Sequence, residues 1–151
     1  MWKGSKQMAQ ERTNFSAGRR KWLDDLKATK ILELDTLENK EIFFLAIALG
    51  YASPKPLKGG ESWIQCNVYT GKERALICSA LLGKLCADGE DVNDSADFMK
   101  CNRYAEQCAE EGFNRLETIC RDNHNDNEEI CAYLMNELDR LYDMNIAAED
   151  M

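Results

Sequence analysis

The sequence predicts an all-α protein: a compact single domain of about five helices with one irregular loop around residues 53–69. Apolar residues recur at helical spacing through most of the chain, and both prolines fall inside the expected loop. Because 44% of the 151 residues are hydrophobic, the chain can bury a core, which excludes an intrinsically disordered protein. Residues 1–16 are expected to be a flexible segment ahead of a helical domain over residues 17–151.

The first three helices are expected on either side of the loop. Residues 17–27 form a short amphipathic helix, and residues 37–51 form a central one that is apolar on nearly all sides. Within the loop, residues 63–69 alternate as a strand would, but no second strand is evident, so no sheet is predicted. Thr70 and Glu73 then have the spacing of a capping box that opens the third helix.

The second half of the chain predicts three further helical segments. A helix over residues 93–111 is expected to stop at Gly112, followed by a shorter helix over residues 113–121. The last helix covers residues 126–144, and we expect its apolar stripe to pack in the core. The residues of this stripe are Ile130, Cys131, Leu134, Met135, Leu138, Leu141 and Tyr142.

The formal net charge of −8 is unevenly distributed along the chain. Residues 1–75 hold 13 Lys and Arg against 9 Asp and Glu, whereas residues 76–151 hold 6 against 18. The basic half predicts a candidate nucleic-acid-binding strip, which would hold phosphates without reading the base sequence. The strip comprises Arg19, Arg20, Lys21, Lys27 and Lys30. A solvated basic surface is the alternative interpretation.

The acidic half predicts a candidate partner-binding face, on which spaced carboxylates would mimic nucleic acid and occupy a basic groove. Its residues are Asp88, Glu90, Asp91, Asp94, Asp97, Glu106, Glu110 and Glu111. The alternative is an acidic surface that serves solubility alone.

No arrangement of catalytic or metal-binding residues is evident in the sequence. The single histidine, His124, lies in a polar turn, and a calcium loop starting at Asp122 would need glycine where Asn127 stands. None of the seven cysteines has CxxC spacing, so we expect reduced, mostly buried thiols. We therefore predict no catalytic residues, no metal and no cofactor.

The longest apolar stretch, residues 42–52, is about half as long as a membrane-spanning helix requires. Residues 1–30 lack the apolar segment of a secretory signal. We therefore expect a cytoplasmic protein without membrane contacts.

Two segments, residues 41–57 and residues 104–116, resemble small proteins encoded beside prokaryotic DNA phosphorothioation (Dnd) systems. Residues 41–51, Glu-Ile-Phe-Phe-Leu-Ala-Ile-Ala-Leu-Gly-Tyr, followed by Pro54 to Leu57, match an acidic-led helix of that family. Tyr104-Ala105 and the residues from Gly112 to Leu116 match its second helix, although residues 106–111 stand where the family has Asn-Gly. The resemblance implies an accessory role in prokaryotic genome defence or mobile-element biology, and it implies no catalytic residues.

We therefore predict a non-catalytic accessory or regulatory protein that acts through protein–protein contacts close to DNA. Its expected partner is a subunit of a defence or nucleic-acid-processing complex, and whether it also binds nucleic acid is left open. The alternative is an inhibitor encoded by a virus or mobile element, whose acidic helices mimic nucleic acid and block a defence effector.

Overall fold

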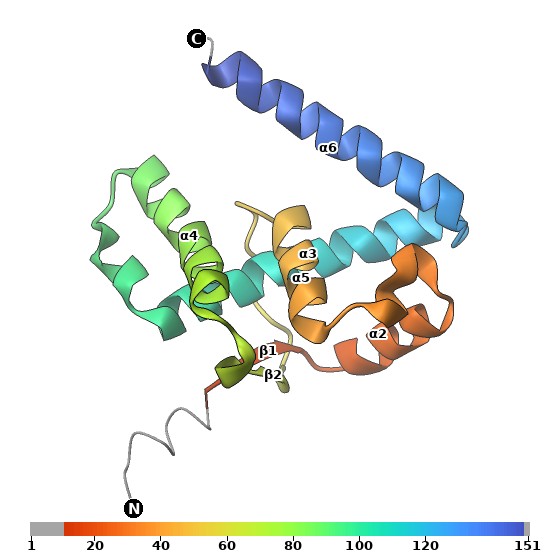
Figure 1. Cartoon of the computed structure of the whole chain (residues 1–151), viewed down its shortest axis with the longest axis horizontal. Helices are drawn as coiled ribbons and strands as arrows, with labels where there is room; N and C mark the ends of the chain where they lie inside the picture. The colour runs from red at the N-terminus through yellow and green to blue at the C-terminus, as the bar shows by residue number, and fades with distance from the viewer. Residues whose placement is uncertain (1–10, 150–151) are drawn as a thin grey trace, which may run out of the picture.

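The computed structural model describes residues 11–149, except the side chains of Leu138, Leu141, Tyr142 and residues 144–149. Over this range the protein is mostly helical, as the sequence predicts, with one small two-stranded sheet. Helix α5 is the longest element and runs through the middle of the molecule, with the other elements around it (Figure 1). The elements in chain order are β1 (Arg12–Ser16), α2 (Arg19–Ala28), η1 (Ile31–Thr36), α3 (Asn39–Leu49), β2 (Gly60–Gln65), η2 (Cys66–Val68), α4 (Gly71–Asp88), η3 (Val92–Ala96), α5 (Phe98–Asp122) and α6 (Asn127–Glu149).

Helix α4 begins at the predicted capping box. The Glu73 amide donates to Thr70 Oγ1 at 3.2 Å, and the Thr70 amide donates to Glu73 Oε1 at 2.8 Å. The helix ends at Gly89, which takes a left-handed conformation with φ of 68°. The side chains of the capping box therefore set the start of this helix, and the left-handed backbone of Gly89 sets its end.

The expected helix end at Gly112 is wrong, because α5 continues through it to Asp122. Gly112 is instead the point where α3 crosses α5. A Cβ at Gly112 would lie 1.8 Å from the carbonyl oxygen of Ala46, and one at Gly50 would lie 1.9 Å from that of Cys108. Both glycines are conformationally ordinary, and their role is to let the two backbones touch.

The expectation that residues 1–16 are flexible is wrong for Arg12–Ser16, which form strand β1. This strand pairs antiparallel with β2, so the two together make the sheet that the sequence analysis did not predict. Thr13, Phe15 and Ser16 are buried, because β1 packs on α5. Residues 1–10, the rest of the expected flexible segment, lie outside the described residues.

Aromatic rings form the centre of the core. Phe15 stacks on Trp63 with ring centroids 4.8 Å apart, which joins β1 to β2. The Trp63 ring meets the edges or faces of Phe43 from α3 and Phe113 from α5. One cluster of side chains therefore ties the sheet to the crossing of α3 and α5.

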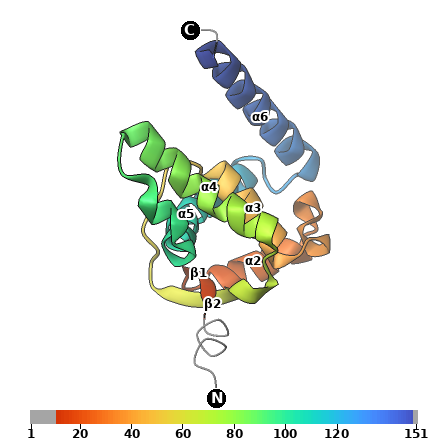
Figure 2. The ribbon, with the colours of Figure 1, turned by 60° about the vertical axis from the view of Figure 1, so that its left-hand side comes forward.

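Helix α6 is only partly packed against the rest of the protein. Ile130 and Leu134 are buried, whereas Tyr133 and Met135 are 47% and 66% exposed. Beyond its first turns the helix diverges from α5 and projects away from the body (Figures 1 and 2). The expected core stripe is therefore wrong for Met135, and its members Leu138, Leu141 and Tyr142 have side chains outside the described residues.

Candidate protein-interaction surface

The five residues of the predicted basic strip do not form one free cationic surface. Arg19 Nη2 lies 3.4 Å from Glu110 Oε1, and its Nη1 lies 3.3 Å from Glu117 Oε2. Its guanidinium also stacks on the rings of Trp22 and Phe113. Because the Arg19 side chain is 9% exposed and fully engaged, the interpretation of Arg19 as a phosphate contact is wrong.

The other strip residues differ in how free they are. Arg20 donates to the Glu61 carboxylate at 3.0 Å and to the Ser62 carbonyl at 2.6 Å. Lys27 donates to Asn39 Oδ1 at 3.2 Å. Lys21 and Lys30 are exposed. Two lysines without a side-chain partner among the described residues provide little positive charge for binding nucleic acid.

The predicted acidic face also separates into parts. Glu106 and Glu110 are each 3% exposed, so placing them on a binding face was wrong. Asp88, Glu90, Asp91, Asp94 and Asp97 are exposed together at the corner between α4 and α5. Two of these five already pair with lysines: Asp88 with Lys84 and Asp94 with Lys100. Glu111 is half-buried and lies in a different place, beside α6.

Glu106 belongs to a buried polar network that fixes β1 onto α5. The Asn14 amide donates to Glu106 Oε2 at 2.7 Å, and Arg103 pairs with the same oxygen. Burial raises the pKa of Glu106 above its usual range, against the opposing effects of Arg103 and the Asn14 amide. This carboxylate therefore has a structural role.

Thr13 is the centre of the same network. Its hydroxyl donates to Asn102 Oδ1 at 2.9 Å, which leaves the Tyr69 hydroxyl to donate to Thr13 Oγ1 at 2.7 Å. Burial raises the pKa of Tyr69, so its hydroxyl stays protonated and keeps donating. The network links β1 to η2 and to α5 with satisfied groups, as a structural anchor does.

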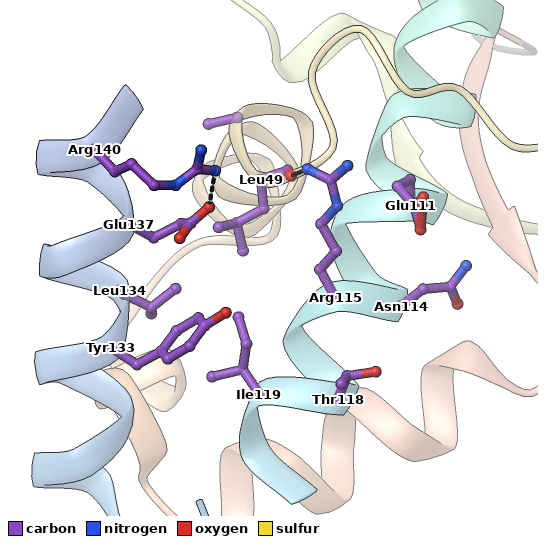
Figure 3. A pocket seen from close by; sticks show the side chains of 11 residues that line it. Leu49, Glu111, Asn114, Arg115, Thr118, Ile119, Tyr133, Leu134, Glu137 and Arg140 are labelled. Carbon is purple, nitrogen blue, oxygen red and sulfur yellow. Dashed lines mark hydrogen bonds and ion pairs between the residues drawn. The ribbon is translucent and has the colours of Figure 1, made fainter. Parts of the chain in front are cut away.

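A groove of about 460 Å³ opens where α6 diverges from α5 (Figure 3). Its apolar part comprises Leu49 from the end of α3, Ile119 from α5, and Tyr133 and Leu134 from α6. Figure 3 shows Tyr133 reaching across from α6 toward Ile119. The groove thus has helices on two sides, the end of a third helix between them, and an exposed aromatic side chain.

Charged side chains surround this apolar part. Arg115 Nη1 donates to the Leu49 carbonyl at 2.5 Å, and its Nη2 donates to Ser53 Oγ at 3.2 Å. Arg140 pairs with Glu137, which lowers the pKa of that carboxyl, so both arginines are engaged within the protein. Glu111 makes no ion pair within the described residues, and its carboxylate lines the groove.

Four of the seven cysteines lie in the interior of the protein. Cys66, Cys101, Cys108 and Cys120 are buried, and burial raises the pKa of each thiol. All seven cysteines are free, as expected, although Cys86 is exposed.

Among residues 11–149, no cluster of three His, Cys, Asp or Glu could hold a metal ion. Over the same residues, no helix is long and apolar enough to cross a membrane.

The chain matches no protein-family model, no curated protein and no solved structure. The resemblance to Dnd-associated proteins therefore stays a prediction from the sequence. Its two matched segments, around Gly50 and Gly112, meet at the crossing of α3 and α5. The shared residues are thus accounted for by helix packing.

Sequence reasoning missed the groove, because it assigned the whole apolar stripe of α6 to the core. One available signal was composition: residues 127–149 hold six acidic side chains and one basic side chain, Arg140. A helix that carries so much charge beside an apolar stripe is typical of a surface helix whose polar face lies in solvent.

Proposed function

We propose that the protein is a non-catalytic accessory protein that works by binding another protein through α6 and the groove beside it. The observation that carries this proposal is the packing of α6. A helix of 23 residues, about 34 Å long, is held to the body by its first turns and by buried Ile130 and Leu134. Because most of the stability of a helix in a protein comes from packing of its apolar face, a projecting helix gains stability when a partner covers it.

The exposed apolar side chains support the same proposal. Tyr133 and Met135 leave large apolar surfaces in solvent on different sides of one turn of α6, and Tyr133 borders the groove. Aromatic and methionine side chains are enriched at the centres of protein interfaces. The setting in prokaryotic genome defence is part of the proposal and rests on the resemblance of residues 41–57 and 104–116.

Inhibition by nucleic-acid mimicry is less well supported. With Glu106 and Glu110 buried, five of the eight predicted carboxylates remain together at the α4–α5 corner, and two of those are neutralised by lysines. The corner therefore offers three carboxylates without a lysine partner to a groove that binds a phosphate backbone.

The proposal is tested by calorimetric titration of the full chain against the proteins encoded beside its gene. We expect one of them to bind with one-to-one stoichiometry, and Tyr133→Asp to weaken that affinity at least about tenfold, or about 1.4 kcal/mol. Leu76→Asp is the matched control, because Leu76 is also an exposed apolar residue on a helix, at 60% exposure on α4. Absence of a binding neighbour, or equal weakening by both variants, would contradict the proposal.

A further inference from the structure

The outer face of α4 exposes apolar side chains to solvent. Between Ala75 and Gly83 the helix has no charged residue, and a helix that is apolar on all sides is usually buried. However, α4 lies at the surface of the molecule, away from α6 (Figures 1 and 2). Leu76 and Leu82 are 60% and 40% exposed there. Exposed apolar residues that gather on one face indicate a protein–protein contact.

The exposed residues on this face form one stripe along the helix, which we call the α4 stripe. Its members recur at intervals of three and four, as residues on one helix face do. They are Lys72, Ala75, Leu76, Ser79, Leu82 and Cys86. Ser79 stands in the middle, with one leucine three residues before it and one three residues after it. Two copies of the stripe that lie side by side in opposite directions therefore bring Leu76 of each copy to Leu82 of the other.

The two ends of the stripe carry opposite charges. Lys72 is exposed in the first turn of α4, where a positive charge opposes the helix dipole, and it makes no ion pair within the described residues. Glu90 and Asp91 are exposed just beyond the last turn, at the acidic α4–α5 corner. Helical side chains lean toward the N-terminus of their helix, so in an antiparallel pair Lys72 of each copy leans toward the acidic end of the other. Charge complementarity therefore selects an antiparallel second copy as the occupant.

We infer that two copies of the protein form an antiparallel dimer through the α4 stripe, with the two-fold axis at Ser79. A two-fold dimer uses the same surface on both copies, and this stripe is complementary to itself in apolar pattern and in charge. The inference goes beyond the proposed function, because it concerns a different helix and leaves the groove beside α6 open to its partner. The stripe is only about 21 Å long, so we expect a small interface and micromolar dissociation.

Sedimentation equilibrium of the full chain tests the dimer. Leu76→Asp should weaken it at least about tenfold, because a carboxylate would be buried between two apolar faces. Tyr133→Asp is the matched control, since it introduces the same charge at an exposed residue of α6 and should leave the dimer unchanged. The inference is overturned by a wild-type protein that stays monomeric at about 200 μM, or by a dimer that Tyr133→Asp weakens and Leu76→Asp does not.

A cysteine crosslink tests the antiparallel arrangement. The two copies of Ser79 meet at the axis, so Ser79→Cys should give a disulfide-linked dimer with oxidised glutathione, which is reduced to two thiols in the exchange. Cys86 is the internal control, because it is exposed on the same stripe but lies seven residues from the axis. Its two copies would be about 21 Å apart, too far for a disulfide. Crosslinking of the wild-type protein through Cys86 would show a parallel pair and would overturn the inference.

Charge reversal tests the ends of the stripe. Lys72→Glu should weaken the dimer at least about threefold, because it places like charges at both ends. Adding Glu90→Lys to the same chain should restore most of the lost affinity, since each copy then again presents a lysine to a glutamate. If Lys72→Glu has no effect, or if the second substitution weakens the dimer further, the antiparallel pairing is refuted.

Discussion

Replacing Gly112 by alanine is the sharpest perturbation of the fold that the structure offers. The new Cβ would lie 1.8 Å from the Ala46 carbonyl oxygen, where ordinary contact begins at 3.4 Å. Because the obstructing atom is backbone in the middle of α3, no side-chain rotation relieves the clash. Helices α3 and α5 must separate by about 1.5 Å, which removes a large part of the dispersion energy between facing atoms.

We expect Gly112→Ala to lower the free energy of unfolding by about 2–4 kcal/mol. Overpacking of a core costs about 1–3 kcal/mol when side chains can adjust, and more is expected here because two backbones collide. The gain in helix propensity from glycine to alanine returns about 1 kcal/mol of this loss. For a domain of this length, the melting temperature should fall by about 5–15 °C.

Urea unfolding followed by circular dichroism measures this change. Gly71→Ala is the control, because Gly71 also lies in a helix and a Cβ there meets nothing within 4 Å. The control should keep the wild-type stability or exceed it slightly. A Gly112→Ala protein as stable as wild type would refute the close approach of α3 and α5.

Three further predictions test the reassigned residues. Arg19→Ala should lower the free energy of unfolding by about 3 kcal/mol in urea titrations, because it leaves the buried Glu110 carboxylate unpaired. Lys21→Ala, at an exposed residue, should change the free energy of unfolding by less than about 0.5 kcal/mol. Equal effects of the two substitutions would contradict the structural role of Arg19. Because burial raises the pKa of Glu106, the native state binds that proton more tightly than the unfolded chain, so wild-type stability falls as pH rises through this pKa. Glu106→Gln lacks this loss and should gain stability relative to wild type as the pH rises above the ordinary pKa of a glutamate, about 4.3. A difference in stability that does not depend on pH would contradict the burial of Glu106. In thiol titrations with a chromogenic disulfide, Cys86 should react first and the four buried cysteines only on unfolding, and early modification of Cys108 would contradict its placement.

The fold class and most helices could be predicted because they depend on local patterns. The Thr70–Glu73 capping box and Gly89 set the ends of α4 by contacts within a few residues. Gly112 was misinterpreted because a glycine can either end a helix or let two helices pack closely. The residue that decides between these two roles, Ala46, lies 66 positions away in the chain. Strand β1 was missed for the same reason, since its partner begins at Gly60.

The candidate site depends even more on long-range packing. Asn102, Glu106 and Glu110 are spaced four apart along α5, on a face buried by β1 and α2, and their polarity alone predicts a surface. The groove exists because α6 diverges from α5 after Leu134. The apolar stripe of α6 would have the same spacing whether the helix packed along α5 or diverged from it. The periodicity of the sequence therefore does not distinguish the two arrangements.

Hydrogen exchange of the full chain, with and without the partner protein that the titration identifies, tests the docking surface most directly. We predict that the bound partner slows amide exchange along residues 111–119 of α5 and residues 130–140 of α6. Slower exchange confined to residues 88–97, with α6 unchanged, would place binding at the acidic α4–α5 corner and contradict the account.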